Sequence, residues 1–235
     1  MRILLLGADG QVGWALRRAL AVVGQVTPVT RSGREACQAD LSDTAGLTSL
    51  VRDQQPDVIV NAAAYTAVDK AEAEPDLAWM INAESVGVLA RAAKETDALL
   101  VHYSTDYVFD GSGTEPWTED AATDPVNQYG RSKLGGEQAI QESGARHLIF
   151  RTSWVYAAHG HNFLKTMIRL AREREALKVV NDQFGVPAGA DFIADVTAHA
   201  IRHVVDHPDA LGLYHLTPSG ETTWHGYARH AIHRA

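Results

Sequence analysis

The sequence contains a single cysteine, Cys37, so the chain can form no intramolecular disulfide. Such scarcity is typical of a protein that works under reducing conditions, and a lone thiol on a polar segment is not expected to be catalytic. Positive charge is also scarce, because 29 acidic residues against 21 basic ones leave a formal net charge of −8. Nucleic-acid binding depends on clustered Lys and Arg, so we expect no nucleic-acid partner.

Long apolar runs are absent as well. The longest, residues 1–7 and 58–65, fall far short of the roughly 20 residues that span a bilayer. The amino terminus passes directly into a strand-like run, without the longer apolar region and cleavage site of a secretory signal. We therefore expect a cytoplasmic protein without membrane contact. Hydrophobic residues make up 46% of the 235 positions, which is enough for a large globular core.

Short β-rich runs alternate with longer helical patterns through the first half of the chain. This alternation predicts an α/β fold with a doubly wound, Rossmann-like parallel sheet. The strands are expected at residues 2–6, 25–30, 58–61, 99–103 and 147–151. The helices between them are expected at residues 10–23, 44–54, 75–96 and 129–143. Beyond Arg151 the pattern is less regular and predicts a helix at 162–174, a strand at 176–180 and a helix at 190–206.

A glycine-rich turn follows the first predicted strand, with the sequence Gly7-Ala8-Asp9-Gly10-Gln11-Val12-Gly13. Without Cβ atoms the backbone can turn sharply and approach a pyrophosphate, and the following helix offers its N–H donors. Three such glycines can also be ordinary loop residues, but their place between strand and helix favours dinucleotide binding. The expected cofactor contacts are Gly7, Gly10, Gln11, Val12 and Gly13.

The end of the second predicted strand bears on which dinucleotide binds. NAD sites place an acidic residue there, whereas an arginine accommodates the additional phosphate of NADP. This chain has Arg31 with Arg34 close behind, which favours NADPH and leaves NADH as the alternative. Both arginines can equally be solvated loop residues. Further candidate cofactor contacts are Asp40 and Leu41 near the adenine, and the small strand-end residues Ala62, Ala63 and Ala64, which an ordinary packed strand end explains almost as well.

Tyr129 and Lys133 lie four residues apart, so a helix would place them on one face. A nearby ammonium is expected to lower the pKa of the phenol, which would then donate a proton when a carbonyl receives hydride. Ser104-Thr105-Asp106 follows a predicted strand, where the carboxyl ends of parallel strands form ligand sites. Alone, the Tyr and Lys pair is usually a helix surface. Together with the glycine turn and Thr105, it predicts a carbonyl reductase.

With these residues in view, the chain resembles the extended short-chain dehydrogenase/reductases and, within them, the dTDP-4-dehydrorhamnose reductases. The resemblance runs through most of the chain, over residues 7–14, 60–72, 102–109, Tyr129 with Lys133, 150–156 and 181–187. It implies reduction of dTDP-4-dehydro-6-deoxy-L-mannose to dTDP-L-rhamnose, a precursor of bacterial polysaccharides. It also implies that Tyr129 is the proton donor, Lys133 its partner and ribose anchor, and that Thr105 tunes the acid. Thr105, Asp106 and Trp154 would contact the sugar nucleotide, although a core tryptophan is a rival reading of Trp154.

Three departures from the family pattern qualify the resemblance. Residues 1–150 are expected to form the dinucleotide-binding domain, and residues 151–235 a smaller, interleaved substrate-binding part that is truncated because the family usually continues further. Ala15 stands where some members have a glutamate that joins a magnesium-linked dimer, so we expect no metal, while a homodimer stays open. Thr30-Arg31 replaces the acidic residue of some members, in agreement with NADPH.

Two rival functions remain open. A sugar-nucleotide epimerase or 4,6-dehydratase shares the Tyr and Lys pair, but dehydratases of this group follow Thr-Asp with Glu, whereas Tyr107 follows here. A non-catalytic NADP-binding regulatory subunit is the second rival, against which the intact Tyr129, Lys133 and Thr105 speak. The histidines at 159 and 161, and at 199, 203 and 207, lack a Cys or carboxylate to complete a zinc set and are expected to be solvated.

Overall fold

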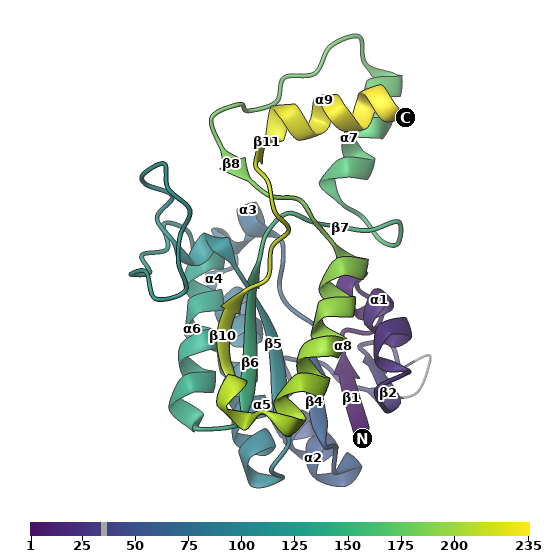
Figure 1. The fold of residues 1–235 in the computed structure, drawn as a ribbon, viewed down its shortest axis with the longest axis vertical. Coiled ribbons are helices and arrows are strands. Elements are labelled where there is room, and N and C mark those ends of the chain that lie inside the picture. The colour runs from purple at the N-terminus through teal and green to yellow at the C-terminus, as the bar shows by residue number, and fades with distance from the viewer. Residues whose placement is uncertain (34–36) are drawn as a thin grey trace.

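A seven-stranded parallel sheet forms the centre of the protein in a computed structural model, which describes residues 1–33 and 37–235 (Figure 1). The strand order across the sheet is β10-β6-β5-β4-β1-β2-β3. The strands are β1 (Arg2–Leu6), β2 (Gln25–Thr30), β3 (Cys37–Gln38), β4 (Val58–Asn61), β5 (Leu99–Thr105), β6 (His147–Thr152) and β10 (Gly212–His215). The predicted doubly wound α/β fold is confirmed.

Helices cover both faces of the sheet, because alternate residues of each buried strand point to opposite sides. Ile3 and Leu5 face a core shared with α1 (Gln11–Leu20) and α8 (Ala190–Asp206). Leu4 and Leu6 face a second core shared with α2 (Thr44–Gln54), α5 (Ser85–Glu95) and α6 (Gln128–Ser143). Strand β5 is buried along its whole length, so its side chains contact both layers.

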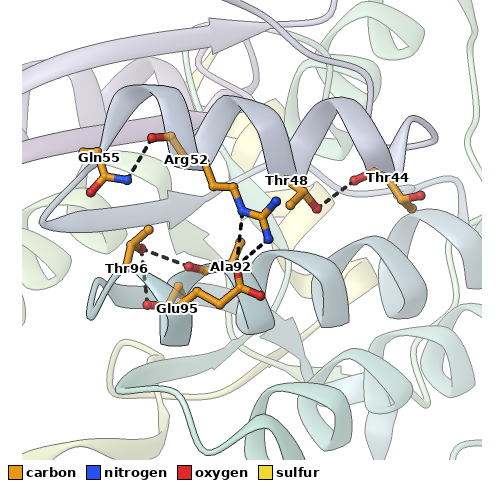
Figure 2. A network of polar contacts seen from close by, with 8 residues as sticks. Thr44, Thr48, Arg52, Gln55, Ala92, Glu95 and Thr96 are labelled. Atoms are coloured by element: carbon orange, nitrogen blue, oxygen red, sulfur yellow. Dashed lines mark hydrogen bonds and ion pairs between the residues drawn. The ribbon is translucent and has the colours of Figure 1, made fainter.

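Polar contacts tie α2 to α5 at the surface of the second layer, as Figure 2 shows. Arg52 donates from Nη2 to Glu95 Oε2 at 2.9 Å. The hydroxyl of Thr48 donates a hydrogen bond to the carbonyl of Thr44 in α2, and that of Thr96 donates to the carbonyl of Ala92 in α5. Exposed ion pairs of this kind contribute at most about 1 kcal/mol, so the two helices are held mainly by the core beneath them.

A small second unit lies beyond the end of the sheet (Figure 1). It contains α7 (Phe163–Glu173) and α9 (Trp224–Arg234), which pack on each other, and β8 (Phe184–Gly185), which pairs with β11 (Thr222–Thr223). A further pair joins β7 (Val155–Tyr156) to β9 (Ala188–Gly189). The chain returns from β9 into α8 and later into β10, so residues beyond 150 contribute to the main sheet as well as to the small unit.

The predicted helix at 75–96 is in fact three segments. These are α4 (Pro75–Trp79), a π-helical turn η1 (Met80–Glu84) and α5. The π turn directs Asn82 inward, where its amide bonds both the backbone N–H and the carbonyl of Tyr65 and also the hydroxyl of Ser132. Through Asn82 the π turn therefore connects the segment that follows β4 to helix α6. The first helix is also shorter than predicted, since it begins after Gly10 and ends at Leu20.

The predicted strand at 176–180 is wrong. These residues adopt no regular secondary structure, and the carbonyl of Val180 accepts a hydrogen bond from the backbone N–H of His225 in α9. Their apolar side chains lie along the α7 and α9 pair rather than in a sheet. By contrast, β5 and β6 extend to Thr105 and Thr152, beyond the predicted ends at 103 and 151. No helix in the described ranges is long and apolar enough to cross a membrane.

Candidate active site

A cavity of about 820 Å³ opens at the carboxyl ends of the strands, between the main sheet and the small unit. It is within the size range of small-molecule sites in proteins. All but one of the residues expected to contact cofactor or substrate line it. The lining includes Gly7, Gly10, Gln11, Val12, Arg31, Asp40, Leu41, Ala62, Ala63, Ala64, Thr105, Asp106, Tyr129, Lys133 and Trp154.

Gly13 is the exception, because it lies beneath the turn rather than on the cavity wall. A Cβ at Gly13 would overlap the carbonyl of Gly7, so this glycine lets α1 pack closely against the turn. Gly7 has a positive φ of 72°, and a Cβ there would lie only 2.6 Å from the backbone nitrogen of Ala63. The glycines therefore bring the ends of β1 and β4 together under the first turn of α1.

Arg31 lies directly after β2, is exposed and lines the cavity together with Asp40. Hydrogen bonds from Ser42, helped by the charge of Arg31, lower the pKa of Asp40, so this carboxylate stays ionised. Gln38 fixes the local backbone by donating from its amide to the carbonyl of Arg31 at 3.0 Å. Arg34, the second arginine of the sequence pattern, lies outside the described residues.

Tyr129 occupies the first turn of α6, which Asn127 caps by accepting from the N–H of Gly130 at 2.7 Å. Its ring meets that of Tyr107 edge to face, with centroids 5.7 Å apart. Thr105, the last residue of β5, lies beside the Tyr129 hydroxyl and lowers its pKa. The helix start and the strand end therefore bring the phenol, the Thr105 hydroxyl and the Asp106 carboxylate to one edge of the cavity.

The expected lowering of the Tyr129 pKa by Lys133 is wrong. Burial raises the pKa of Tyr129, and the nearby charge of Asp106 raises it further, while the hydrogen bond to Thr105 acts in the opposite direction. The phenol is therefore protonated at neutral pH. The ammonium of Lys133 does not lower the pKa of Tyr129, because it donates to the carbonyl of Tyr103 in β5.

Lys133 is almost fully buried, with 2% of its surface exposed. Its Nζ donates to the carbonyl of Tyr103 at 2.6 Å and lies 3.2 Å from Nε2 of His102, and both residues belong to β5. Burial lowers the pKa of Lys133 to about 8. A pKa this close to neutrality is unusual for lysine and typical of functional sites.

Two buried hydroxyls on the cavity wall have no hydrogen-bond partner among the described residues. They are Oγ of Ser104 at the end of β5 and Oγ1 of Thr152 at the end of β6. Buried hydroxyls are normally satisfied, so these two groups keep unused hydrogen-bonding capacity beside the cavity. Within the described ranges no group of three or more His, Cys, Asp and Glu side chains is placed to hold a metal ion.

Trp154 lines the cavity and also packs against the small unit. Its ring stacks on Trp224 at a centroid distance of 3.7 Å, and the backbone of Gly185 lies against it so closely that a Cβ would come within 2.7 Å. Trp224, the first residue of α9, also lines the cavity and was not predicted. Trp154 and Trp224 are far apart in the chain, so no local pattern indicates that these two indoles meet.

The loop before α7 also lies at the cavity and was missed as a site segment. His161 and Asn162 are on the wall, and Asn162 donates from Nδ2 to Oε1 of Gln11 at 2.8 Å. This bond joins the small unit to the glycine turn. The sequence pattern presents His161 only as a candidate metal ligand, and the contact of Asn162 with Gln11 joins residues 151 positions apart, which no local pattern encodes.

Comparison with known proteins gives consistent matches. The family model described as RmlD substrate binding domain matches residues 1–235. The dTDP-4-dehydrorhamnose reductase of Salmonella typhimurium is 58% identical over 228 residues, which are 97% of this chain and 76% of that protein. The reductase of the same name from Escherichia coli K12 shows the same identity and coverage.

Solved structures agree with this match. A dTDP-4-dehydrorhamnose reductase from Bacillus anthracis in complex with NADP is 36% identical, with a TM-score of 0.90, covering 99% of this chain and 80% of that one. A UDP-glucose 4-epimerase from Brucella ovis in complex with NAD is only 19% identical, with a TM-score of 0.80, covering 96% of this chain and 80% of that one. At that distance the likeness extends to the fold alone.

Proposed function

The chain belongs to the RmlD substrate binding domain family, and from this premise we propose that it reduces the 4-keto group of dTDP-4-dehydro-6-deoxy-L-mannose with NADPH, giving dTDP-L-rhamnose. The observation that carries the proposal is the single cavity shared by the glycine turn, Arg31 and the Tyr129 and Lys133 pair. The dTDP-4-dehydrorhamnose reductases that are 58% identical support the substrate, and the relative bound to NADP supports the cofactor.

The cavity walls fit a dinucleotide. The Cβ-free surface of Gly7 and the start of α1 leave backbone N–H groups for a pyrophosphate, and Arg31 offers a guanidinium for the additional phosphate of NADPH. Ser104 and Thr152, whose buried hydroxyls have no partner among the described residues, lie in the cavity wall as well. When bound, NADPH supplies the hydride that reduces the carbonyl carbon.

The residues of the chain supply the proton and the orientation. Tyr129 donates its phenolic proton to the carbonyl oxygen, and its raised pKa keeps that proton in place until the oxygen becomes basic. Thr105 lies beside the phenol and tunes its pKa, while Lys133 anchors the nicotinamide ribose. Asp106 and Trp154 contact the sugar nucleotide. These residue roles are proposals that rest on the shared cavity.

NADPH consumption in the presence of the keto-sugar nucleotide tests the function directly. Consumption equal to the dTDP-L-rhamnose formed, identified by chromatography against the authentic compound, supports the reductase. A converted sugar without net consumption would instead mean an epimerase or dehydratase, as would be consistent with the shared Tyr and Lys pair. Tight NADPH binding with no turnover would mean a regulatory subunit, and either result overturns the proposal.

Four broader features accompany the proposed function. We place the reaction in the cytoplasm, with residues 1–150 binding the dinucleotide and residues 151–235 completing the substrate side. We expect neither nucleic acid nor membrane as a partner. Formation of a homodimer stays a prediction, which the molecular mass of the purified chain in analytical sedimentation tests.

A further inference from the structure

His102 is a buried histidine to which the proposed function gives no role. It lies in β5 three residues before Thr105, and only 1% of its surface is exposed. Its Nδ1 is 3.2 Å from Nδ2 of Asn61 at the end of β4, and its Nε2 is 3.2 Å from Nζ of Lys133 on α6. The ring therefore connects three elements and ends on the amine of the proposed active site.

We propose that His102 is a positioning residue for the reaction, which acts by presenting an Nε2–H to the amine of Lys133 and holding it against the carbonyl of Tyr103. This inference rests on the proposed function, in which Lys133 anchors the ribose beside Tyr129. His102 itself lies beneath the cavity wall and does not line it.

Asn61 determines which nitrogen of His102 carries the hydrogen. The Oδ1 of Asn61 accepts from the backbone N–H of Ala63 at 3.2 Å, so its NH₂ group must face the imidazole. The facing Nδ1 is then an acceptor, and in a neutral ring the hydrogen lies on Nε2. Burial lowers the pKa of His102 well below its ordinary value, so the ring stays neutral.

The Nε2–H affects the protonation of Lys133. An ammonium has three donors and no acceptor, so it is disfavoured opposite another donor, whereas a neutral amine accepts from Nε2–H. Glu137, one turn further along α6, favours the charged form of Lys133. Its carboxylate also pairs with Arg151 of β6, with Nη2 and Oε2 2.7 Å apart. The charge of Asp106 acts on Tyr129 instead. His102 therefore keeps Lys133 able to change its protonation state near neutral pH.

Substitution of His102 by glutamine tests this coupling. The amide of His102→Gln reaches the position of Nε2 but can turn its oxygen toward Lys133, which would then favour the ammonium. We expect the pKa of Lys133 to rise by about one unit. NMR titration of the ε-carbon of ¹³C-labelled lysine measures it, with Lys133→Met assigning the signal. The alkaline limb of the kcat/KM profile should move in the same direction.

His147→Gln is the matched control, because His147 begins the neighbouring strand β6 at its far end from the cavity and bonds only the carbonyl of Ala145 among described residues. It should leave both the Lys133 titration and the pH profile unchanged. A purely structural role for His102 would lower stability in His102→Gln without moving either pH readout, and that result would overturn the proposal.

The unaltered protein provides a test that needs no folded variant. Long-range ¹H–¹⁵N correlation spectra distinguish the two imidazole tautomers, and we expect His102 to be protonated on Nε2 throughout the neutral range. An Nδ1–H tautomer would overturn the proposal. Since neither NMR measurement requires turnover, a chain with the expected titration but no keto-sugar reduction would refute the proposed function alone, whereas an active reductase without the shift would refute the coupling alone.

Discussion

The hydroxyl of Thr105 donates a hydrogen bond to the carboxylate of Asp106, with the two oxygens 3.1 Å apart. Thr105 also lies beside Tyr129, whose pKa it lowers, so the Asp106 charge lies one side chain away from the proposed proton donor. Burial raises the pKa of Asp106 to about 6, although the bond from Thr105 lowers it in part. The charge at this edge of the cavity therefore changes within an accessible pH range.

Asp106→Asn should remove a pH dependence of stability. A carboxyl whose pKa is higher in the folded protein than in the unfolded chain stabilises the fold below the unfolded value, and this contribution is lost as pH rises through the folded value. Between about pH 4 and 6 the free energy of unfolding of the wild type should fall by up to about 3 kcal/mol, while that of the variant stays unchanged. The fall is smaller to the extent that solvent reaches the Asp106 side chain. Urea unfolding at several pH values measures the difference.

The exposed Asp110 gives the control for this prediction. Hydrogen bonds from Ser112 lower its pKa, so its contribution has the opposite sign and is lost as pH falls. Asp110→Asn should therefore leave the interval between pH 4 and 6 as in the wild type. Parallel stability curves for wild type and Asp106→Asn would contradict the raised pKa of Asp106.

Tyr129→Phe should retain NADPH binding but lose turnover by about 10²–10⁴-fold, because only the proton donor is removed. Fluorescence titration gives the Kd for NADPH, and steady-state assays give kcat. Tyr214→Phe is the matched control, since Tyr214 lies on the outer strand β10, away from the cavity, and its hydroxyl donates to the carbonyl of Ala210. Unchanged kcat in Tyr129→Phe would refute the assigned role.

The strand ends could be predicted from the sequence because sharp chemical changes mark them. β1, β2 and β4 end at the expected residues, where an apolar run meets Gly7, Arg31 or the small residues from Ala62 onward. The glycine turn and the Tyr129 and Lys133 pair were likewise recognisable, since each is a pattern of local spacing, and the sheet then brings both to one cavity. The π turn at Met80–Glu84 was not, because one extra residue barely disturbs a helical pattern twenty residues long.

Contacts between distant segments account for the remaining errors. The spacing of Tyr129 and Lys133 predicted a shared helix face but not the direction of the amine, which bonds the carbonyl of Tyr103 instead of stabilising a phenolate. The run at 176–180 is apolar enough for a strand, yet it has no partner strand among the described residues and lies beside α9. In both cases a three-dimensional neighbour, not the local pattern, decides the outcome.

Arg31→Asp should shift cofactor preference toward NADH. Arg31 lies at the end of β2 on the cavity wall, where its guanidinium can bind the phosphate that distinguishes NADPH. A charge-assisted hydrogen bond contributes about 1.5–3 kcal/mol, so the ratio of kcat/KM for NADPH to that for NADH should fall by at least about tenfold. Arg31→Lys keeps the charge without the fork and should give an intermediate ratio. An unaltered ratio in Arg31→Asp would count against the phosphate contact.

Glu137→Gln should strongly destabilise the fold. Glu137 of α6 and Arg151 of β6 form a buried pair, with Nη2 to Oε2 at 2.7 Å, Nε to Oε1 at 2.9 Å, and side chains 2% and 6% exposed. Removing one charge leaves the other uncompensated in the interior, so we expect a loss of about 3–5 kcal/mol in the free energy of unfolding. Arg151 also donates to the carbonyl of Glu119, so the loop before α6 should loosen as well.

Glu95→Gln provides the matched comparison, because it breaks the exposed pair with Arg52 shown in Figure 2. Water solvates the remaining guanidinium there, so the cost should stay below about 1 kcal/mol. Urea unfolding of both variants at neutral pH measures the difference, and limited proteolysis reports on residues 110–127. Equal losses in the two variants would mean that Arg151 finds another partner or water once Glu137 is neutral. Burial of the pair would then add little to the stability of the fold.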